Sequence, residues 1–197
     1  MAYAAAWTAE SLGGRGAAAE ALFFLALLAA TLALAGAPRR RTLALNPLRL
    51  DRTAALYGVA VLILLGIEAL VVLTGLFIRP SELIAQARAD AGAVGVANAV
   101  LLAPVAEELL FRGLLFTRLR QTLGALATVS IAAFAFAAFH LEHGIGYVIS
   151  MIPAGLFFGF AREHGGGVAL PVLLHAAMNG AAGVAGLVLV TWPRLLA

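Results

Sequence analysis

Residues 56–78 read LYGVAVLILLGIEALVVLTGLFI and contain only one Asp, Glu, Lys or Arg side chain, that of Glu68. An α-helix needs about 20 predominantly apolar residues to cross the hydrocarbon core of a bilayer, so this stretch predicts a membrane-spanning helix. The rest of the 197-residue chain has the same character, since 63% of all residues are hydrophobic and 12% are charged. Soluble domains average about 45–50% apolar and about 25% charged residues. The composition therefore excludes a water-soluble domain, and it excludes a disordered chain as well.

Several apolar runs of this kind predict an all-α fold, a polytopic transmembrane helical bundle of about six spans. The expected spans cover residues 21–37, 56–78, 94–116, 122–141, 146–161 and 168–190, with a polar surface helix or loop at 81–90. We expect a single integral membrane domain over 1–197, whose motif-bearing core runs from about 94 to 190. Arginines gather in the loops 39–52, 118–121 and 162–167, which favours a cytoplasmic location for these loops.

The ionisable residues exclude several classes of function. A net charge of +3 that is scattered along the chain does not form a nucleic-acid-binding surface. The chain has no cysteine, which excludes disulfides, thiolate metal sites and cysteine nucleophiles. Ser130 and Ser150 lack the Gly-x-Ser-x-Gly setting of a serine hydrolase. Chemistry in this chain therefore has to use carboxylate, imidazole, amide or hydroxyl groups.

Two adjacent glutamates lie inside the apolar run 94–116. Glu108 and Arg112 are four residues apart, so they share a helix face and are expected to pair. Glu107 then lacks a cation on its own helix, and a carboxylate in that position is suited to acid–base chemistry. Pro104 removes a helix hydrogen bond one turn earlier. A purely structural ion pair between helices is the alternative interpretation.

Two histidine motifs lie on later spans. Phe136 and His140 have i,i+4 spacing at the end of one span, and His175 and Asn179 have the same spacing on the last span. An imidazole and an amide supply a base and a donor for a developing oxyanion. The alternative is hydrogen bonding between helices, which is common for His and Asn in membranes. Taken together, the glutamates, histidines and amide favour the hydrolysis of amide bonds.

The three motifs in this order resemble the CPBP family, which includes the type II CAAX prenyl endopeptidases and bacterial abortive-infection and bacteriocin-immunity proteins. The motifs are EELLFRG at 107–113, FAAFH at 136–140 and HAAMN at 175–179. The resemblance covers about 101–180 and implies an intramembrane glutamic-type endopeptidase, also described as a metalloprotease. It implies that Glu107 and His140 activate the water and that His175 and Asn179 stabilise the oxyanion. Glu108, Arg112 and Phe136 then have a supporting role.

The resemblance also implies the partners of such an enzyme. The substrate is expected to be a membrane protein or peptide, for example one with a lipidated or hydrophobic C-terminal tail, cleaved near the lipid bilayer of the bacterial cytoplasmic membrane. No cofactor is certain, and a divalent ion such as zinc held by Glu107, His140 and His175 is an open alternative. A non-catalytic membrane binding or immunity protein of the same fold is the competing hypothesis. A proton-coupled transporter is less favoured, because the chain shows no internal repeat.

One feature of the spans requires an irregular element. By simple counting, His140 ends its span, whereas His175 lies only one or two turns into a parallel span. Ideal helices that rise about 1.5 Å per residue would hold these imidazoles at different depths. We therefore expect tilted helices or a partly re-entrant segment at 141–147.

Overall fold

The computed structural model describes residues 15–49, 51–74 and 93–191, and each regular element in these ranges is a helix. The polar segment 81–90 and the side chain of Glu68 lie outside the described residues. The α-helices are α2 (Arg15–Ala35), α3 (Arg39–Thr42), α4 (Arg52–Thr74), α6 (Ala93–Ala97), α7 (Ala103–Glu108), α8 (Phe116–Leu119), α9 (Ala125–Ala138), α10 (Ile145–Gly165) and α11 (Ala169–Thr191). The expected all-α fold is confirmed.

Three of the described helices are long and apolar enough to cross a membrane. They are Gly16–Ala35, Ala93–Leu119 and Ile145–Gly165, and shorter apolar helices cover Arg52–Ile67, Ala125–Ala138 and Ala169–Ala185. The protein is therefore a multi-pass membrane protein by the length and composition of its helices. The expected number of about six spans stays a prediction.

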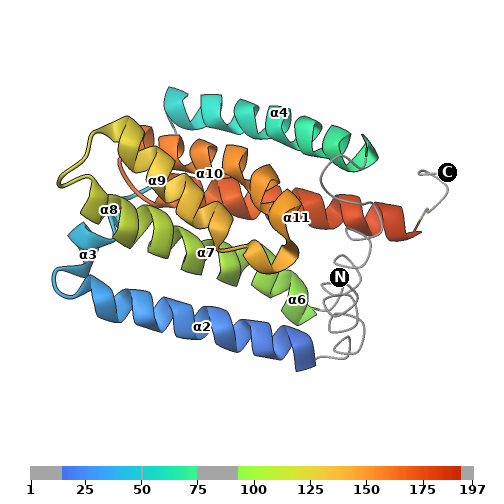
Figure 1. Cartoon of the computed structure of the whole chain (residues 1–197), viewed down its shortest axis with the longest axis horizontal. Coiled ribbons are helices and arrows are strands. Elements are labelled where there is room, and N and C mark those ends of the chain that lie inside the picture. Colours follow the sequence, from blue (N-terminus) through green and yellow to red (C-terminus); the bar gives the residue numbers. More distant parts are fainter. Residues whose placement is uncertain (1–14, 50, 75–92, 192–197) are drawn as a thin grey trace.

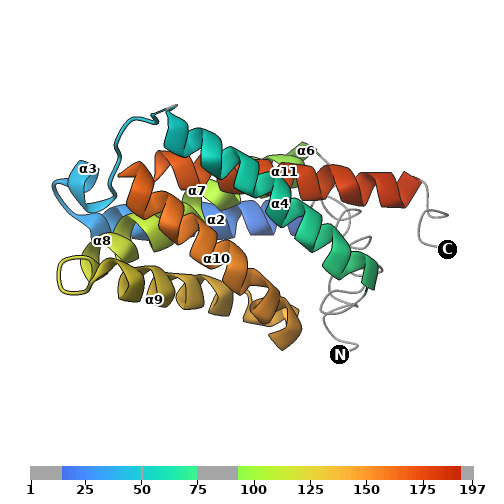
Figure 2. The same ribbon diagram turned by 90° about the horizontal axis from the view of Figure 1, so that it is seen from above.

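A continuous helix from Ala93 to Leu119 forms the centre of the bundle. It comprises α6, α7 and α8 joined by two π-helical segments, Asn98–Leu102 and Leu109–Leu115. The central helix contacts α2, α9, α10 and α11, while α2 and α4 lie at opposite edges of the bundle (Figure 1). Viewed from above, α4 crosses α11 and runs beside α10 (Figure 2). This arrangement surrounds the two glutamates with protein on several sides.

Glycines allow α9 and α10 to approach closely. A Cβ at Gly155 would lie 2.9 Å from the backbone oxygen of Ala133, and one at Gly159 would lie 2.9 Å from a methyl carbon of Val129. Such distances are shorter than van der Waals contact, so only glycine fits at these two positions without a shift of the helices. Close approach through small residues is how helices pack tightly in lipid. The Gly-xxx-Gly pair in α10 is thus a packing feature.

The connection between α9 and α10 is irregular over part of the expected range 141–147, while its re-entrant character stays a prediction. A 3₁₀ turn covers Leu141–His143, and Gly144 follows it with a φ of +94°. Since α10 then begins at Ile145, the irregularity ends earlier than the expected residue 147. At its other end α10 continues past the predicted limit of 161 to Gly165, so Arg162 and Glu163 are helical rather than part of a loop. Glu163 accepts two hydrogen bonds of 3.0 Å from Arg120, which tie the end of α8 to α10.

Candidate active site

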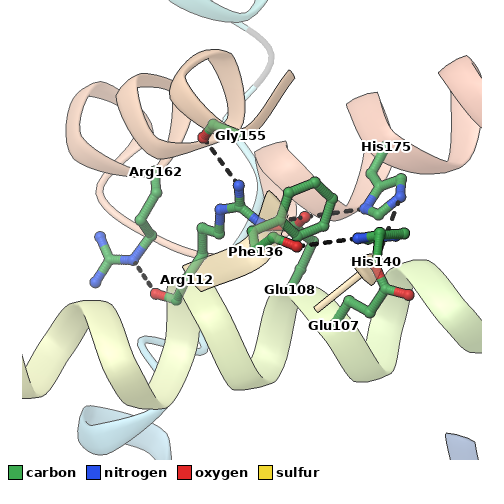
Figure 3. Close-up of polar contacts among 8 residues, drawn as sticks. All are labelled: Glu107, Glu108, Arg112, Phe136, His140, Gly155, Arg162 and His175. Atoms are coloured by element: carbon green, nitrogen blue, oxygen red, sulfur yellow. Dashed lines mark hydrogen bonds and ion pairs between the residues drawn. The ribbon is translucent and has the colours of Figure 1, made fainter. Parts of the chain in front are cut away.

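The polar residues of the central helix are removed from solvent. Glu107 is 4% exposed, while Glu108 and Arg112 are completely buried. His175 of α11 faces them with 6% exposure, and Phe136 and His140 approach from α9 and the turn after it (Figure 3). The three motifs, which are distant in sequence, therefore meet at one place in the bundle.

Glu108 connects two of these helices. Its Oε1 accepts a hydrogen bond of 3.0 Å from Nη1 of Arg112 and one of 2.9 Å from Nδ1 of His175 (Figure 3). The pair predicted from the i,i+4 spacing is therefore present, and the same oxygen also orients His175. Arg112 donates a further bond of 2.9 Å from Nη2 to the backbone oxygen of Gly155. Its Cζ lies 4.4 Å from the centre of the Phe136 ring, a cation–π contact.

The bond to Glu108 decides which nitrogen of His175 carries the proton. A carboxylate held by Arg112 accepts hydrogen bonds only, so Nδ1 of His175 must be the donor. In the neutral imidazole Nε2 then presents a lone pair, and it lies 4.0 Å from Oε2 of Glu107. This oxygen is buried and has no hydrogen-bond partner among the described residues. A buried oxygen without a donor is the expected position for a water.

His140 has its orientation determined in a similar way. Its Nδ1 lies 2.9 Å from the backbone oxygen of Phe136, and because a carbonyl only accepts, Nδ1 carries the hydrogen and Nε2 the lone pair. The rings of His140 and His175 lie 5.0 and 5.7 Å from the Phe136 ring, respectively. Phe136 is thus in contact with both imidazoles. No hydrogen bond or ion pair joins His140 to Glu107 in the described part of the chain.

Asn179 donates a hydrogen bond to a backbone oxygen of the first π-helical segment. The N–H of Ala103 bonds to the oxygen of Asn98 five residues earlier, and residue 104 is a proline without an N–H. The carbonyl of Ala99 is thereby left without its usual helical donor, and it accepts a bond of 2.8 Å from Nδ2 of Asn179. One hydrogen of this Nδ2 is used by the bond, and the second stays available for other acceptors.

The second π-helical segment also leaves a backbone oxygen to a side chain of another helix. The N–H of Phe116, which an α-helix would direct to Arg112, bonds to the oxygen of Phe111. The freed Arg112 carbonyl accepts a bond of 2.9 Å from Nε of Arg162 on α10 (Figure 3). π-bulges often occur at functional sites, and here one flanks the glutamates on each side. Each presents a backbone oxygen to a side chain of another helix.

Three contributors to this site were not found from the sequence. Phe158 stacks on the His175 ring at 4.8 Å and 19°, the Gly155 oxygen binds Arg112, and Arg162 binds the Arg112 carbonyl. The Gly-xxx-Gly spacing around Gly155 indicates a close helix approach, but it does not indicate a bond to a buried arginine. Phe158 and Arg162 carry no sequence signal that separates them from other apolar and terminal helix residues.

A catalytic zinc ion needs about three protein ligands close together. Among the residues that the structure describes, no group of three or more His, Asp and Glu side chains is placed to hold one. The zinc alternative, with Glu107, His140 and His175 as ligands, therefore has no ready ligand set in this arrangement.

Comparison with known proteins agrees with this geometry. Residues 90–181 match the family model described as "Type II CAAX prenyl endopeptidase Rce1-like". These residues are an Rce1-like domain. The matched range includes all three motifs, and the family supports a CAAX protease-like endopeptidase. Neither a curated protein nor a solved structure gave a match to the chain.

Proposed function

We propose that this Rce1-like protein is a glutamic-type intramembrane endopeptidase of the bacterial cytoplasmic membrane. Its substrate is a membrane protein or peptide with a lipidated or hydrophobic C-terminal tail, cleaved close to the bilayer. The observation that carries the proposal is the placement of Glu107, a buried carboxylate whose Oε2 has no partner among the described residues and lies 4.0 Å from Nε2 of His175. A structural ion pair needs Glu108 and Arg112, but it does not need this second carboxylate.

The separation of Glu107 and His175 suits one water molecule. A water can donate one hydrogen bond to Oε2 and one to Nε2 at ordinary lengths, because the two atoms are 4.0 Å apart. The oxygen of that water is then directed at a peptide carbonyl carbon. As the new C–O bond forms, Glu107 takes a proton from the water, and the proton later passes to the leaving amine nitrogen.

Donors for the oxyanion come from the same side chains. The second N–H of Asn179 is one donor, and Nε2 of His175 becomes another when the proton that Glu107 has taken from the water passes to it on the way to the leaving amine nitrogen. The role of His140 as a partner of Glu107 in water activation stays a prediction: its Nε2 carries a lone pair because Nδ1 is held by the Phe136 oxygen, but the water described above lies between Glu107 and His175. Glu108 and Arg112 keep His175 in the required tautomer, which is the positioning role of a carboxylate behind a catalytic histidine.

The proposal is tested by comparing protein termini in membranes of the source cells. One strain carries the intact protein, a second carries Glu107→Gln, and a third carries Glu142→Gln as a matched control. Glu142 is suited to this role because its side chain is 73% exposed in the turn after α9. We expect termini that disappear with Glu107→Gln and persist with Glu142→Gln, which would also identify the substrate. An unchanged set of termini, with the variant folded and still active in a phenotype, would instead favour a binding or immunity role.

A further inference from the structure

Two cavities meet end to end between α4 and the junction of α10 with α11. The first, of about 410 Å³, lies at the start of α4, and the second, of about 510 Å³, continues between α4 and α11. Asp51 and Leu170 line both cavities. Each volume falls in the range of small-molecule sites, about 300–1,000 Å³. The two cavities differ sharply in chemistry, and this difference identifies a ligand class.

The first cavity is polar, with one arginine and one aspartate in its lining, and it lies beside a positively charged loop. Its side chains include Arg49, Asp51, Thr53 and His164. The loop 39–52 that forms one wall carries five arginines and one aspartate. Asp51 is the one acidic residue of the loop 39–52, and its Oδ1 accepts a hydrogen bond of 3.1 Å from the N–H of Ala54. Part of its negative charge is therefore used at the start of α4. The excess of arginine in this loop favours an anionic group in the cavity.

The walls of the polar cavity are held together by specific bonds. Nδ1 of His164 on α10 and the hydroxyl of Tyr57 on α4 are 2.7 Å apart, and Asn46 donates a bond of 2.6 Å to the oxygen of Gly166. These contacts join the loop, α4 and the α10–α11 turn. The cavity is therefore built by three separate parts of the chain.

The second cavity is an apolar groove along the outer face of the bundle. Small residues form much of its α4 side, and a Cβ added at Gly58 would meet no described atom within 4 Å. On the α11 side, Leu173 is 49% exposed and Leu174 is buried. Small residues on a membrane helix normally permit close packing, but here they leave unfilled space. An acyl chain has the shape and polarity to fill it.

We propose that these two cavities bind one anionic glycerophospholipid of the bilayer. Its phosphate lies in the polar cavity beside Arg49, and an acyl chain follows the apolar groove between α4 and α11. Anionic headgroups are attracted to basic segments at a membrane surface, and the apolar chain gains from burial in the groove. This site is separate from Glu107 and does not depend on the proposed peptidase activity.

The apolar part of the site is tested with a matched pair of glycines on α4. Gly58→Leu places a side chain in the groove, and Gly66→Leu makes the same change on the same helix outside the groove, also with no described atom within 4 Å. The full-length protein in detergent is supplied with phosphatidylglycerol, and bound lipid is counted by native mass spectrometry. We expect one lipid on the wild type and on Gly66→Leu, and about tenfold weaker retention by Gly58→Leu.

The headgroup is tested in the same experiment. Arg49→Gln is expected to weaken phosphatidylglycerol retention about tenfold, whereas Arg40→Gln, in the same basic loop but not in the cavity lining, is expected to leave it unchanged. Phosphatidylcholine is the zwitterionic comparison and should be retained less well. Equal retention by Gly58→Leu and Gly66→Leu, or equal retention of the two lipids, would overturn the proposal. Displacement of phosphatidylglycerol by a prenylated peptide would also overturn it, because the groove would then belong to a substrate.

Discussion

Glu107 and Glu108 are adjacent in the sequence but have different surroundings. Oε1 of Glu108 receives hydrogen bonds from Arg112 and His175, whereas the ion pair of Glu107 among the described residues is the one with His175 at 4.0 Å; Oε2 of each glutamate receives no hydrogen bond from these residues. Removal of one partner from a buried ion pair costs about 3–5 kcal/mol. We therefore expect Glu108→Gln to lower the free energy of unfolding by about that amount, and Glu107→Gln to lower it by less than about 1 kcal/mol. Thermal unfolding in detergent measures both.

The same two variants separate stability from activity. Glu107→Gln should abolish cleavage in a protein that unfolds at nearly the wild-type temperature. A Glu107→Gln protein as unstable as Glu108→Gln would show that Glu107 is part of the structural ion-pair network, and it would remove the main argument for a catalytic role.

Asn179 combines a structural contact with a proposed role in the reaction. Its bond to the Ala99 oxygen is worth about 0.5–1.5 kcal/mol of stability, as for an ordinary hydrogen bond. If its second N–H binds the oxyanion, Asn179→Ala should also lower kcat by roughly 10²–10³-fold. Peptidase assays at a temperature where both proteins are fully folded would test this. A kcat within about twofold of the wild type would restrict Asn179 to its contact with the π-helical segment.

Among the helices, the close contact between α9 and α10 depends on glycines of α10, which carry no side chain. Gly155→Ala would place a Cβ 2.9 Å from the Ala133 oxygen, so the two helices must separate. Overpacking of this kind costs about 1–3 kcal/mol, and the shift also displaces the Gly155 oxygen from Arg112. We expect lower thermal stability and reduced activity in Gly155→Ala. Gly66→Ala on α4, where a Cβ meets no described atom within 4 Å, is the control and should be neutral or slightly stabilising.

The two π-helical segments illustrate what an element contributes to the site. A regular α-helix would satisfy the carbonyls of Ala99 and Arg112 internally. The wider turns instead present these oxygens to Asn179 of α11 and Arg162 of α10. The central helix is thereby attached to both helices that flank the glutamates. Pro104 has no N–H to offer the Ala99 carbonyl in the first segment, whereas no residue type marks the second segment in advance.

At the scale of the whole molecule, the arginine-rich loops gather at one end of the bundle. Helix α3, the end of α8 and the α10–α11 turn lie at this end, while the turn after α9 lies at the opposite end (Figures 1 and 2). The positive-inside rule predicts that the arginine-rich end is cytoplasmic. Because the chain has no cysteine, single-cysteine variants report this directly.

Two matched variants test the orientation. Leu45→Cys lies at the arginine-rich end and Leu141→Cys at the other, with exposures of 40% and 61%. In intact cells, a membrane-impermeant thiol reagent should label Leu141→Cys, and it should label Leu45→Cys only after the membrane is permeabilised. The reverse pattern would place the arginine-rich end outside the cytoplasm.

The membrane environment of this protein and the identity of its reactive groups follow from the amino-acid sequence alone. Apolar runs of about 20 residues require helices in lipid, because backbone groups there must be satisfied internally. Spacing of four residues placed Glu108 beside Arg112, and this local geometry does not depend on the rest of the fold. The mismatch in depth of His140 and His175 likewise indicated an irregular turn after α9. These features follow from local periodicity, which is why they could be predicted.

Only the tertiary structure decided how these groups are connected. Glu108 orients His175, Phe136 touches both imidazoles, and the Gly155 oxygen completes the environment of Arg112. Each contact joins helices that are distant in sequence, and its existence depends on the rotation and depth of one helix against another. Most residues on every side of these helices are apolar. The sequence therefore carries little information about which face of a helix packs against which neighbouring helix. The packing of α9, α10 and α11 around the central helix supplies that information and leaves Glu107 facing His175.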